Sequence, residues 1–158
     1  MSEDPPIHPR EGPGSARPAA DRVLAALVDA SPLAVVAVDP EGVVTLWNPA
    51  AGRIFGWSAE EAIGARLPFV QAEKQLEFRA ICARALAGES FDEPELHRRR
   101  ADGSPIVVRA WFSPLRRSDG SIHGILSILA DTAVPGTDGD GEEMREIARK
   151  VLEAAEPA

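Results

Sequence analysis

Residues 47–64 read WNPAAGRIFGWSAEEAIG and predict two very short helices in succession. The first begins at Pro49, which suits a first helical turn because no N–H is needed there, and it ends at Gly56. The second has Ser58 as its N-cap and a glutamate three residues later, which makes a capping box, and it ends at Gly64. Since helices in globular proteins usually run to about three turns or more, this stretch is expected to form a wall folded around something small.

The composition is that of a soluble globular protein with room for one domain and tails. The chain has 158 residues, of which 44% are hydrophobic and 27% are charged. Its net charge of -8 makes a nucleic-acid backbone a poor partner, and its one cysteine, Cys82, excludes an internal disulfide and a thiolate zinc cluster. The N-terminus lacks the apolar core of a signal peptide, and no apolar run approaches membrane-spanning length. We therefore expect a cytoplasmic protein with no nucleic-acid partner and no membrane partner.

Changes in composition divide the chain into five segments. Proline predicts a disordered N-terminal tail, apolar residues at helical spacing predict a helix on each side of the domain, and glycine with aspartate predicts a flexible linker. The expected segments are the tail (1–18), the N-terminal flanking helix (19–32), the domain (33–133), the linker (134–141) and the C-terminal helix (142–156). The stripe of the flanking helix carries Val23, Leu24 and Leu27, and it must lie on the outside of the domain or against a partner.

Within the domain, β-branched runs bounded by turn residues predict five strands, and apolar spacing predicts one long helix. The strands are expected at 33–38, 43–47, 91–99, 105–115 and 122–130, and the long helix at 72–86. This order predicts an α+β fold with an antiparallel sheet and helices packed on one face.

The outer face of the sheet is expected to carry two tryptophans. Alternation along the fourth strand places Arg109 and Trp111 on one face, and the arginine marks that face as the outer one. Alternation along the second strand places Trp47 on the same side and Asn48 on the other, where its partly buried amide is expected to bond to backbone. Because exposed tryptophans are costly, the N-terminal helix, from the same chain or from a second copy, is expected to cover them.

Several motifs, in this order along the chain, resemble those of PAS domains, the sensing modules of bacterial signalling proteins. The resemblance covers roughly residues 28–132. It is carried by SP followed by VDPEG in 31–42, NPAA in 48–51, GWSAEEAIG in 56–64, RRRADG in 98–103, SPLR in 113–116, and DG, G and D in 119–131. The family implies a five-stranded antiparallel sheet whose short helices and long helix enclose a cavity. Its members commonly dimerise through an N-terminal helix and the outer sheet face, which agrees with the tryptophan hypothesis.

The resemblance leaves the cofactor unknown. Light-sensing flavin members carry GxNCRFLQ, whose cysteine bonds the flavin, whereas residues 64–71 here read GARLPFVQ, with leucine in that place. Adduct chemistry is therefore disfavoured, and Cys82 is expected to be a small core residue. Haem-binding members take an axial histidine from the long helix, and residues 72–88 contain none, so haem is disfavoured as well.

A noncovalently held flavin or another small ligand stays an alternative to a filled core. Apolar walls, an aromatic ring for stacking and a few polar groups are what such a site needs. The candidate ligand-binding residues are Asn48, Ile54, Phe55, Ile63, Phe69, Gln71, Phe78 and Phe112.

The chemistry-bearing residues do not predict an enzyme, since there is no nucleophile–base arrangement, phosphate-binding glycine loop or metal-ligand spacing. Many sensor PAS domains end in Asp-Ile-Thr leading straight into a coiled coil, whereas here Asp131 and Thr132 precede the glycine-rich segment. A flexible linker argues against rigid coupling to an effector, and favours either a stand-alone adaptor or a piece of a longer sensor.

Two functions are therefore expected. The first is a sensory PAS module that couples a small ligand or redox cofactor to dimerisation or to binding of a partner such as a kinase or regulator. The alternative is a ligand-free interaction domain that works as an adaptor. A homodimer is expected, and the candidate interface residues are Val23, Leu24, Leu27, Trp47 and Trp111.

Overall fold

The computed structural model describes residues 16–133 and 142–155, so the expected linker and most of the expected tail lie outside the described residues. The helices are α1 (Ala16–Ala30), α2 (Pro49–Phe55), α3 (Ala59–Ala62), the 3-10 turn η3 (Ala72–Lys74), α4 (Gln75–Leu86) and α5 (Glu142–Ala155). The strands are β1 (Ala34–Val38), β2 (Val44–Trp47), β3 (Phe91–Arg99), β4 (Pro105–Arg116) and β5 (Ile122–Asp131). The first helix thus begins three residues earlier than the sequence pattern predicts.

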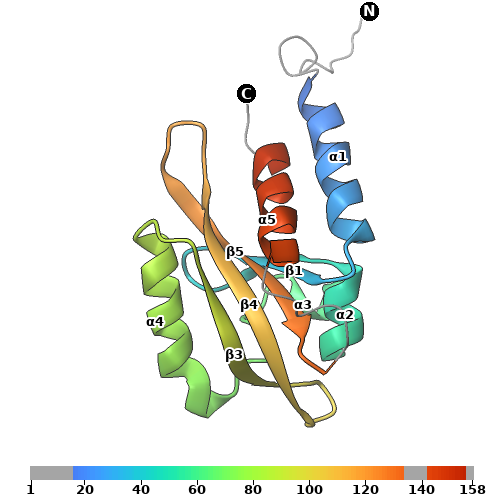
Figure 1. Cartoon of the computed structure of the whole chain (residues 1–158), viewed down its shortest axis with the longest axis vertical. Helices are drawn as coiled ribbons and strands as arrows, with labels where there is room; N and C mark the ends of the chain where they lie inside the picture. The colour runs from blue at the N-terminus through green and yellow to red at the C-terminus, as the bar shows by residue number, and fades with distance from the viewer. Residues whose placement is uncertain (1–15, 134–141, 156–158) are drawn as a thin grey trace, which may run out of the picture.

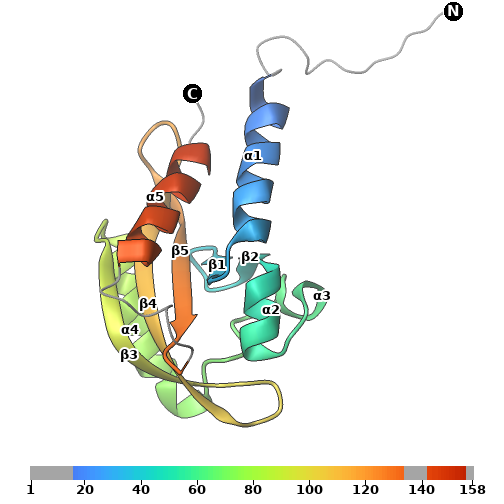
Figure 2. The ribbon, with the colours of Figure 1, turned by 45° about the vertical axis from the view of Figure 1, so that its right-hand side comes forward.

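The five strands form one antiparallel sheet with the spatial order β2-β1-β5-β4-β3. The short helices α2 and α3 and the long helix α4 pack on one face, which we call the inner face. Helix α5 lies against the opposite, outer face, with α1 beside it (Figures 1 and 2). The expected α+β fold and five-stranded antiparallel sheet are confirmed. Coverage of the outer face by the C-terminal helix was not predicted.

The two short helices end and begin where their capping residues require. Asn48 is the N-cap of α2, and Gly56 ends that helix in the left-handed conformation at φ 96°, with its N–H donated to the carbonyl of Gly52. Ser58 and Glu61 form the predicted capping box at the start of α3. These local signals work from sequence because each cap satisfies backbone groups within a few residues of itself.

A β-bulge in β2 changes which side chains reach the inner core. The register of β1 against β2 shifts between Ala37 and Val38, so that Thr45 is an extra residue in β2. An extra residue interrupts strict alternation, and Trp47 therefore shares the inner face with Val44, where it is only 4% exposed. The prediction that Trp47 lies on the outer face is wrong, and so is its assignment to an interface.

Two apolar clusters, one on each face of the sheet, make up the core. The inner cluster joins the sheet to α2, α3 and α4. The outer cluster joins the sheet to α5 and to the end of α1. Its buried members are Val28, Leu33, Val35, Leu126, Ile128, Ala130, Met144, Ala148 and Val151.

Candidate functional site

The inner face is filled by aromatic rings that pack on one another. Phe55 and Phe69 are stacked with ring centroids 4.1 Å apart, and Trp47 lies 5.9 Å from Phe69 and 6.1 Å from Phe55. Phe55 is fully buried and Phe69 nearly so. Contacts of this kind stabilise the fold beyond the area they bury. Two of the predicted ligand-binding residues thus contact each other and a tryptophan.

The other predicted ligand-binding side chains have mixed positions. Phe112 is buried against Phe91, with ring centroids 5.4 Å apart, and Ile54 and Phe78 pack half-buried against the inner cluster. Ile63 is 46% exposed, because it caps the C-terminus of α3 instead of facing the core. The prediction that Ile63 lines an internal ligand site is wrong.

Gln71 combines two properties of a ligand contact. It precedes η3 and is half-buried, and its Oε1 is a buried atom with no hydrogen-bond partner. Buried acceptors are normally bonded, so this oxygen is an exception within the described part of the chain. Of the predicted polar contacts, Gln71 is the one whose oxygen stays available.

Asn48 is buried and its side chain makes four hydrogen bonds to backbone. Its Oδ1 accepts from the N–H of Val35 at 2.9 Å and from that of Ala51 at 3.0 Å. Its Nδ2 donates to the carbonyls of Val28 at 2.8 Å and Leu33 at 3.1 Å. The predicted bonding to backbone is confirmed. Because both donors and both acceptor positions are used, assigning Asn48 to ligand binding is wrong.

The outer face is covered by α5 from the same chain. Trp111 lies there as predicted, half-buried in the outer cluster, with the guanidinium of Arg145 6.0 Å from its ring centroid. Buried Met144, Ala148 and Val151 place one stripe of α5 on the sheet. The helix that covers Trp111 is thus α5 instead of the predicted N-terminal helix. The apolar spacing of residues 144–152 predicts a helix with one buried face, but it does not indicate which surface that face covers.

Helices α1 and α5 pack together and leave an apolar groove between them. The groove has a volume of about 360 Å³ and is lined by Val23, Ala26, Leu27, Ala30, Ser31, Pro32, Ile147, Lys150 and Val151. Val23 is 54% exposed and Leu27 is half-buried. The side chain of Leu24 lies outside the described side chains. Two of the predicted interface residues thus share an accessible surface.

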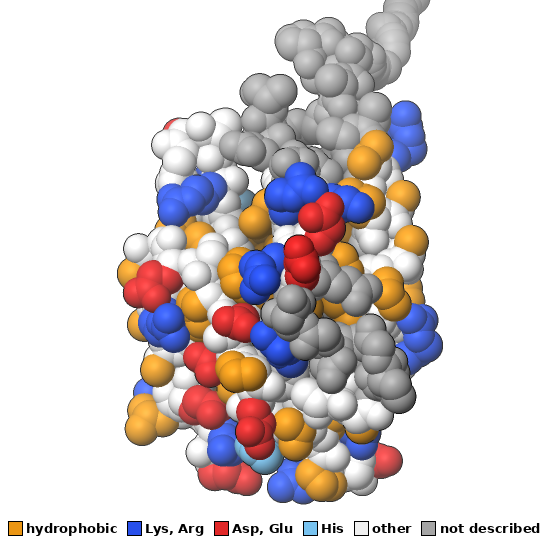
Figure 3. Space-filling model, viewed as in Figure 1, with side chains coloured by type: hydrophobic (Ala, Val, Ile, Leu, Met, Phe, Trp, Pro, Cys, Tyr) orange, Lys and Arg blue, Asp and Glu red, His pale blue; other side chains and the backbone are white. Residues whose placement is uncertain are grey.

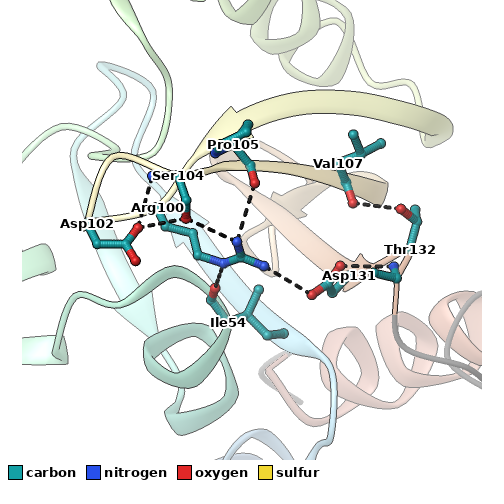
Figure 4. A network of polar contacts seen from close by, with 9 residues as sticks. Ile54, Arg100, Asp102, Ser104, Pro105, Val107, Asp131 and Thr132 are labelled. Atoms are coloured by element: carbon teal, nitrogen blue, oxygen red, sulfur yellow. Dashed lines mark hydrogen bonds and ion pairs between the residues drawn. The ribbon is translucent and has the colours of Figure 1, made fainter.

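Arg100 joins three segments at the opposite end of the sheet (Figure 4). Its Nε donates to the carbonyl of Ile54 at 3.2 Å, and its Nη1 donates to Ser104 Oγ at 3.2 Å and to the carbonyl of Pro105 at 3.3 Å. Its Nη2 lies 3.4 Å from Asp131 Oδ2. The end of α2, the β3–β4 turn and the end of β5 are therefore held by one side chain.

The residues that follow β5 are also held by hydrogen bonds. Both the N–H and the hydroxyl of Thr132 donate to the carbonyl of Val107, at 3.1 and 2.9 Å, and the N–H of Ala133 donates to Asp131 Oδ1 at 3.0 Å. The chain is thus bonded to β4 through Thr132, and Ala133, the last described residue before α5, bonds to Asp131 at the end of β5.

The inner face holds a buried charged side chain that the sequence analysis did not identify, the arginine Arg98. Arg98 lies near the end of β3 but is only 2% exposed on the inner face, and its Nη1 donates to Glu77 Oε1 at 2.8 Å and to the carbonyl of His97 at 2.9 Å. The contact ties β3 to α4. Alternation with buried Leu96 in the same strand is the signal that could have found it.

Within residues 16–133 and 142–155, three ionisable side chains have displaced pKa values. Burial raises the pKa of Cys82 to about 11, so its thiol stays protonated and unreactive at neutral pH. Hydrogen bonds from Ser104 lower the pKa of Asp102, and hydrogen bonds from Ser121 lower that of Asp119. Both aspartates are exposed turn residues, so these shifts reflect turn formation instead of a catalytic site.

The surface around α5 is uneven in charge and shape. Figure 3 views this face and shows side chains of both signs gathered over the helix, with apolar side chains exposed beside it. A cavity of about 400 Å³ lies on the outer face beside the last turns of α5. A more open cleft of about 650 Å³ lies beside α2 and α3, with Trp57 and Arg53 in its lining.

The sequence matches the family model described as PAS fold over residues 23–132, a span that holds all five strands, α2, α3 and α4. The chain belongs to the PAS fold family. No protein of curated function matches it.

Solved PAS structures share this fold. The PAS domain of a Colwellia psychrerythraea protein is 23% identical with a TM-score of 0.61, over 68% of this chain and 92% of that one. The Rhodobacter sphaeroides LOV protein is 20% identical with a TM-score of 0.65, over 87% and 82%. A domain of a Geobacter sulfurreducens sensory box sensor histidine kinase/response regulator is 25% identical with a TM-score of 0.58, over 73% and 94%.

The inner face of this PAS domain does not fit the cysteinyl flavin adduct of light-sensing members. Leu67, which replaces the adduct-forming cysteine, is buried in the inner cluster, and the stacked rings of Phe55 and Phe69 fill the space between α2 and the segment that follows α3.

Among the described residues, no group of three or more histidine, cysteine, aspartate or glutamate side chains could hold a metal ion. None of the described helices is long and apolar enough to span a bilayer.

Proposed function

We propose that this chain is a PAS signalling module that acts by association through the surface shared by α1 and α5. The observation that carries the proposal is the apolar groove between these helices, with Val23 left 54% exposed at its edge. Exposed apolar grooves of this kind mark interaction sites. The simplest occupant is a second copy of the chain, whose own Val23 can enter the same groove by twofold symmetry.

The PAS family and its neighbours support a signalling role. The Geobacter neighbour is described as part of a sensory box sensor histidine kinase/response regulator, which makes a kinase or regulator a reasonable partner for the same surface. We further propose that the protein is cytoplasmic. A second copy of the chain and a kinase or regulator would bind the same groove, and the homodimer is tested first because it needs only the purified chain.

Light scattering of the purified chain tests the association. We expect an apparent mass of twice 16.8 kDa for the wild type. Val23→Glu places a charge in an apolar contact and should shift the mass to that of one chain. Leu76→Glu is the matched control, since Leu76 is 75% exposed on α4 and lies outside the groove. A wild-type chain that stays monomeric at high micromolar concentration, or a dimer that Val23→Glu leaves intact, overturns the homodimer.

A second candidate function is recognition of a small ligand on the inner face. Gln71 favours it, because its buried Oε1 has no hydrogen-bond partner and would accept one from a ligand. Native mass spectrometry and visible absorbance of the purified chain should then reveal a bound molecule, which Gln71→Leu should weaken. A colourless protein whose native mass is that of one chain or of two chains, with no added mass, would remove this candidate and leave the ligand-free adaptor.

A further inference from the structure

The cavity on the outer face has the composition of a ligand site that is separate from the inner face. It runs across the sheet beside α5, and residues from all five strands or their adjoining loops reach it. From its size, its apolar walls and the cationic side chain at its edge, we propose that this cavity binds a small amphipathic monocarboxylate, such as a medium-chain fatty acid.

The walls fit the apolar part of such a molecule. The cavity is lined by Leu46, Leu115 and Leu126 from the sheet and by Val151 and Leu152 from α5. Its volume of about 400 Å³ lies within the ~300–1,000 Å³ of small-molecule sites, which are mostly apolar with a few polar groups that fix orientation.

The polar groups of the lining fit a carboxylate. Arg116 lines the cavity, and among the described residues it has no acidic partner; its Nη1 donates only to the carbonyl of Gly120, at 3.1 Å. Its guanidinium lies close to the backbone at Gly88, since a Cβ built there would be 3.2 Å from Nη2. His123 and the Ser90–Ser113 hydroxyl pair, 3.0 Å apart, add further hydrogen-bonding groups.

Neighbouring arginines differ from Arg116 in this respect. Arg84 pairs with Glu89 at 3.0 Å and with Glu93 at 3.5 Å, so its charge is already compensated. Arg117 points its guanidinium at Ser121 Oγ and does not line the cavity. An anion that enters the cavity therefore meets one uncompensated guanidinium, which suits a single carboxylate better than a dicarboxylate.

The size of the cavity favours a small molecule over a protein partner. A stable protein interface needs on the order of 800 Å² from each partner, and α5 already covers the adjoining part of the outer face. Because Val151 and Leu152 form one wall, a ligand bound here contacts α5 and the sheet together. Binding should therefore hold α5 more firmly on the sheet.

Isothermal titration with decanoate, below its micelle concentration, tests the site. We expect saturable binding to the wild-type chain, and about tenfold or greater weakening by Arg116→Gln, the loss expected for a charge-assisted hydrogen bond. Arg117→Gln is the matched control and should leave binding unchanged. Thr45→Trp changes an exposed residue of the lining, adds bulk to the cavity and should also weaken binding.

Two further probes separate the parts of the ligand. Acetate lacks the apolar chain and should not bind measurably, whereas decanol should bind weakly and equally to the wild type and to Arg116→Gln. Hydrogen exchange of the α5 amides should slow when decanoate is added. Equal weakening by Arg116→Gln and Arg117→Gln, or no saturable binding at all, would overturn the proposal.

Binding at this cavity does not require the dimer proposed above. The titration is read per chain, and the light-scattering test is made without ligand, so either result can fail while the other stands.

Discussion

Among single residues, Asn48 has the largest share in joining separate parts of the chain. Its four hydrogen bonds connect the end of α1, the loop before β1, β1 itself and the first turn of α2. Each bond satisfies a backbone group that is buried together with it, and a buried polar group left unsatisfied costs about 1–3 kcal/mol. The residue therefore acts on stability and on the placement of α1, and it has no atom left for a ligand.

Asn48→Ala should lower the free energy of unfolding by about 2–3 kcal/mol, because the buried N–H of Val35 loses its partner and three further backbone groups each lose one of their hydrogen bonds. Ser58→Ala is the matched control, since Ser58 is also an N-cap but an exposed one, and its loss should cost about 1 kcal/mol. Urea denaturation measures both. Similar losses for the two variants would contradict the role assigned to Asn48.

Residue-scale prediction from sequence succeeded where the deciding contact is local or chemically forced. A buried amide must find backbone partners, so the bonding of Asn48 was predictable, although which backbone groups it meets was not. Exposure of Ile63 was not predictable, because it depends on α3 ending after a single turn. Alternation with Leu96 indicates the inner face for Arg98, but its burial also needs the carboxylate of Glu77, which lies 21 residues away in the chain.

At the scale of elements, capping signals predicted the helices better than alternation predicted the strand faces. The capping box of α3 and the end of α2 were found from sequence, since each is complete within a few residues. The bulge at Thr45 was not, because it is defined by pairing with β1. One extra residue reverses every later side chain of a strand, which is why Trp47 was placed on the wrong face.

Helix α5 illustrates a different limit on prediction. Its apolar stripe was read correctly, and so was its length, but a stripe does not say which surface it meets. The structure places it on the sheet of the same chain, where its buried residues belong to the outer cluster together with Ile128 and Ala130. Helix α5 covers only part of the outer face of the sheet. The groove between α1 and α5 and the cavity beside the last turns of α5 both lie where this coverage ends.

For the whole molecule, the two clusters on opposite faces of the sheet differ in which segments of the chain supply their residues. The inner cluster is built entirely from residues between Ala34 and Leu129, whereas the outer cluster needs Met144, Ala148 and Val151 from α5. The domain expected over 33–133 can therefore keep its inner core without α5, and the outer face would then be exposed. Sequence patterns could not show which face holds the core that is independent of α5, since both faces carry apolar residues.

A chain truncated after Ala133 should keep its folded inner core and self-associate through the uncovered outer face. Trp111, Ile128 and Leu126 would become accessible there, and contiguous apolar patches of this kind drive association. Near-ultraviolet circular dichroism should retain the signal of the Trp47 cluster, while light scattering should give a mass above that of one truncated chain. In the same truncated chain Trp111→Lys should reduce the association, and Val23→Glu should not, because Val23 belongs to the α1–α5 groove. Loss of the near-ultraviolet signal, or a truncated chain that stays monomeric, would show that the two faces are not independent in this way.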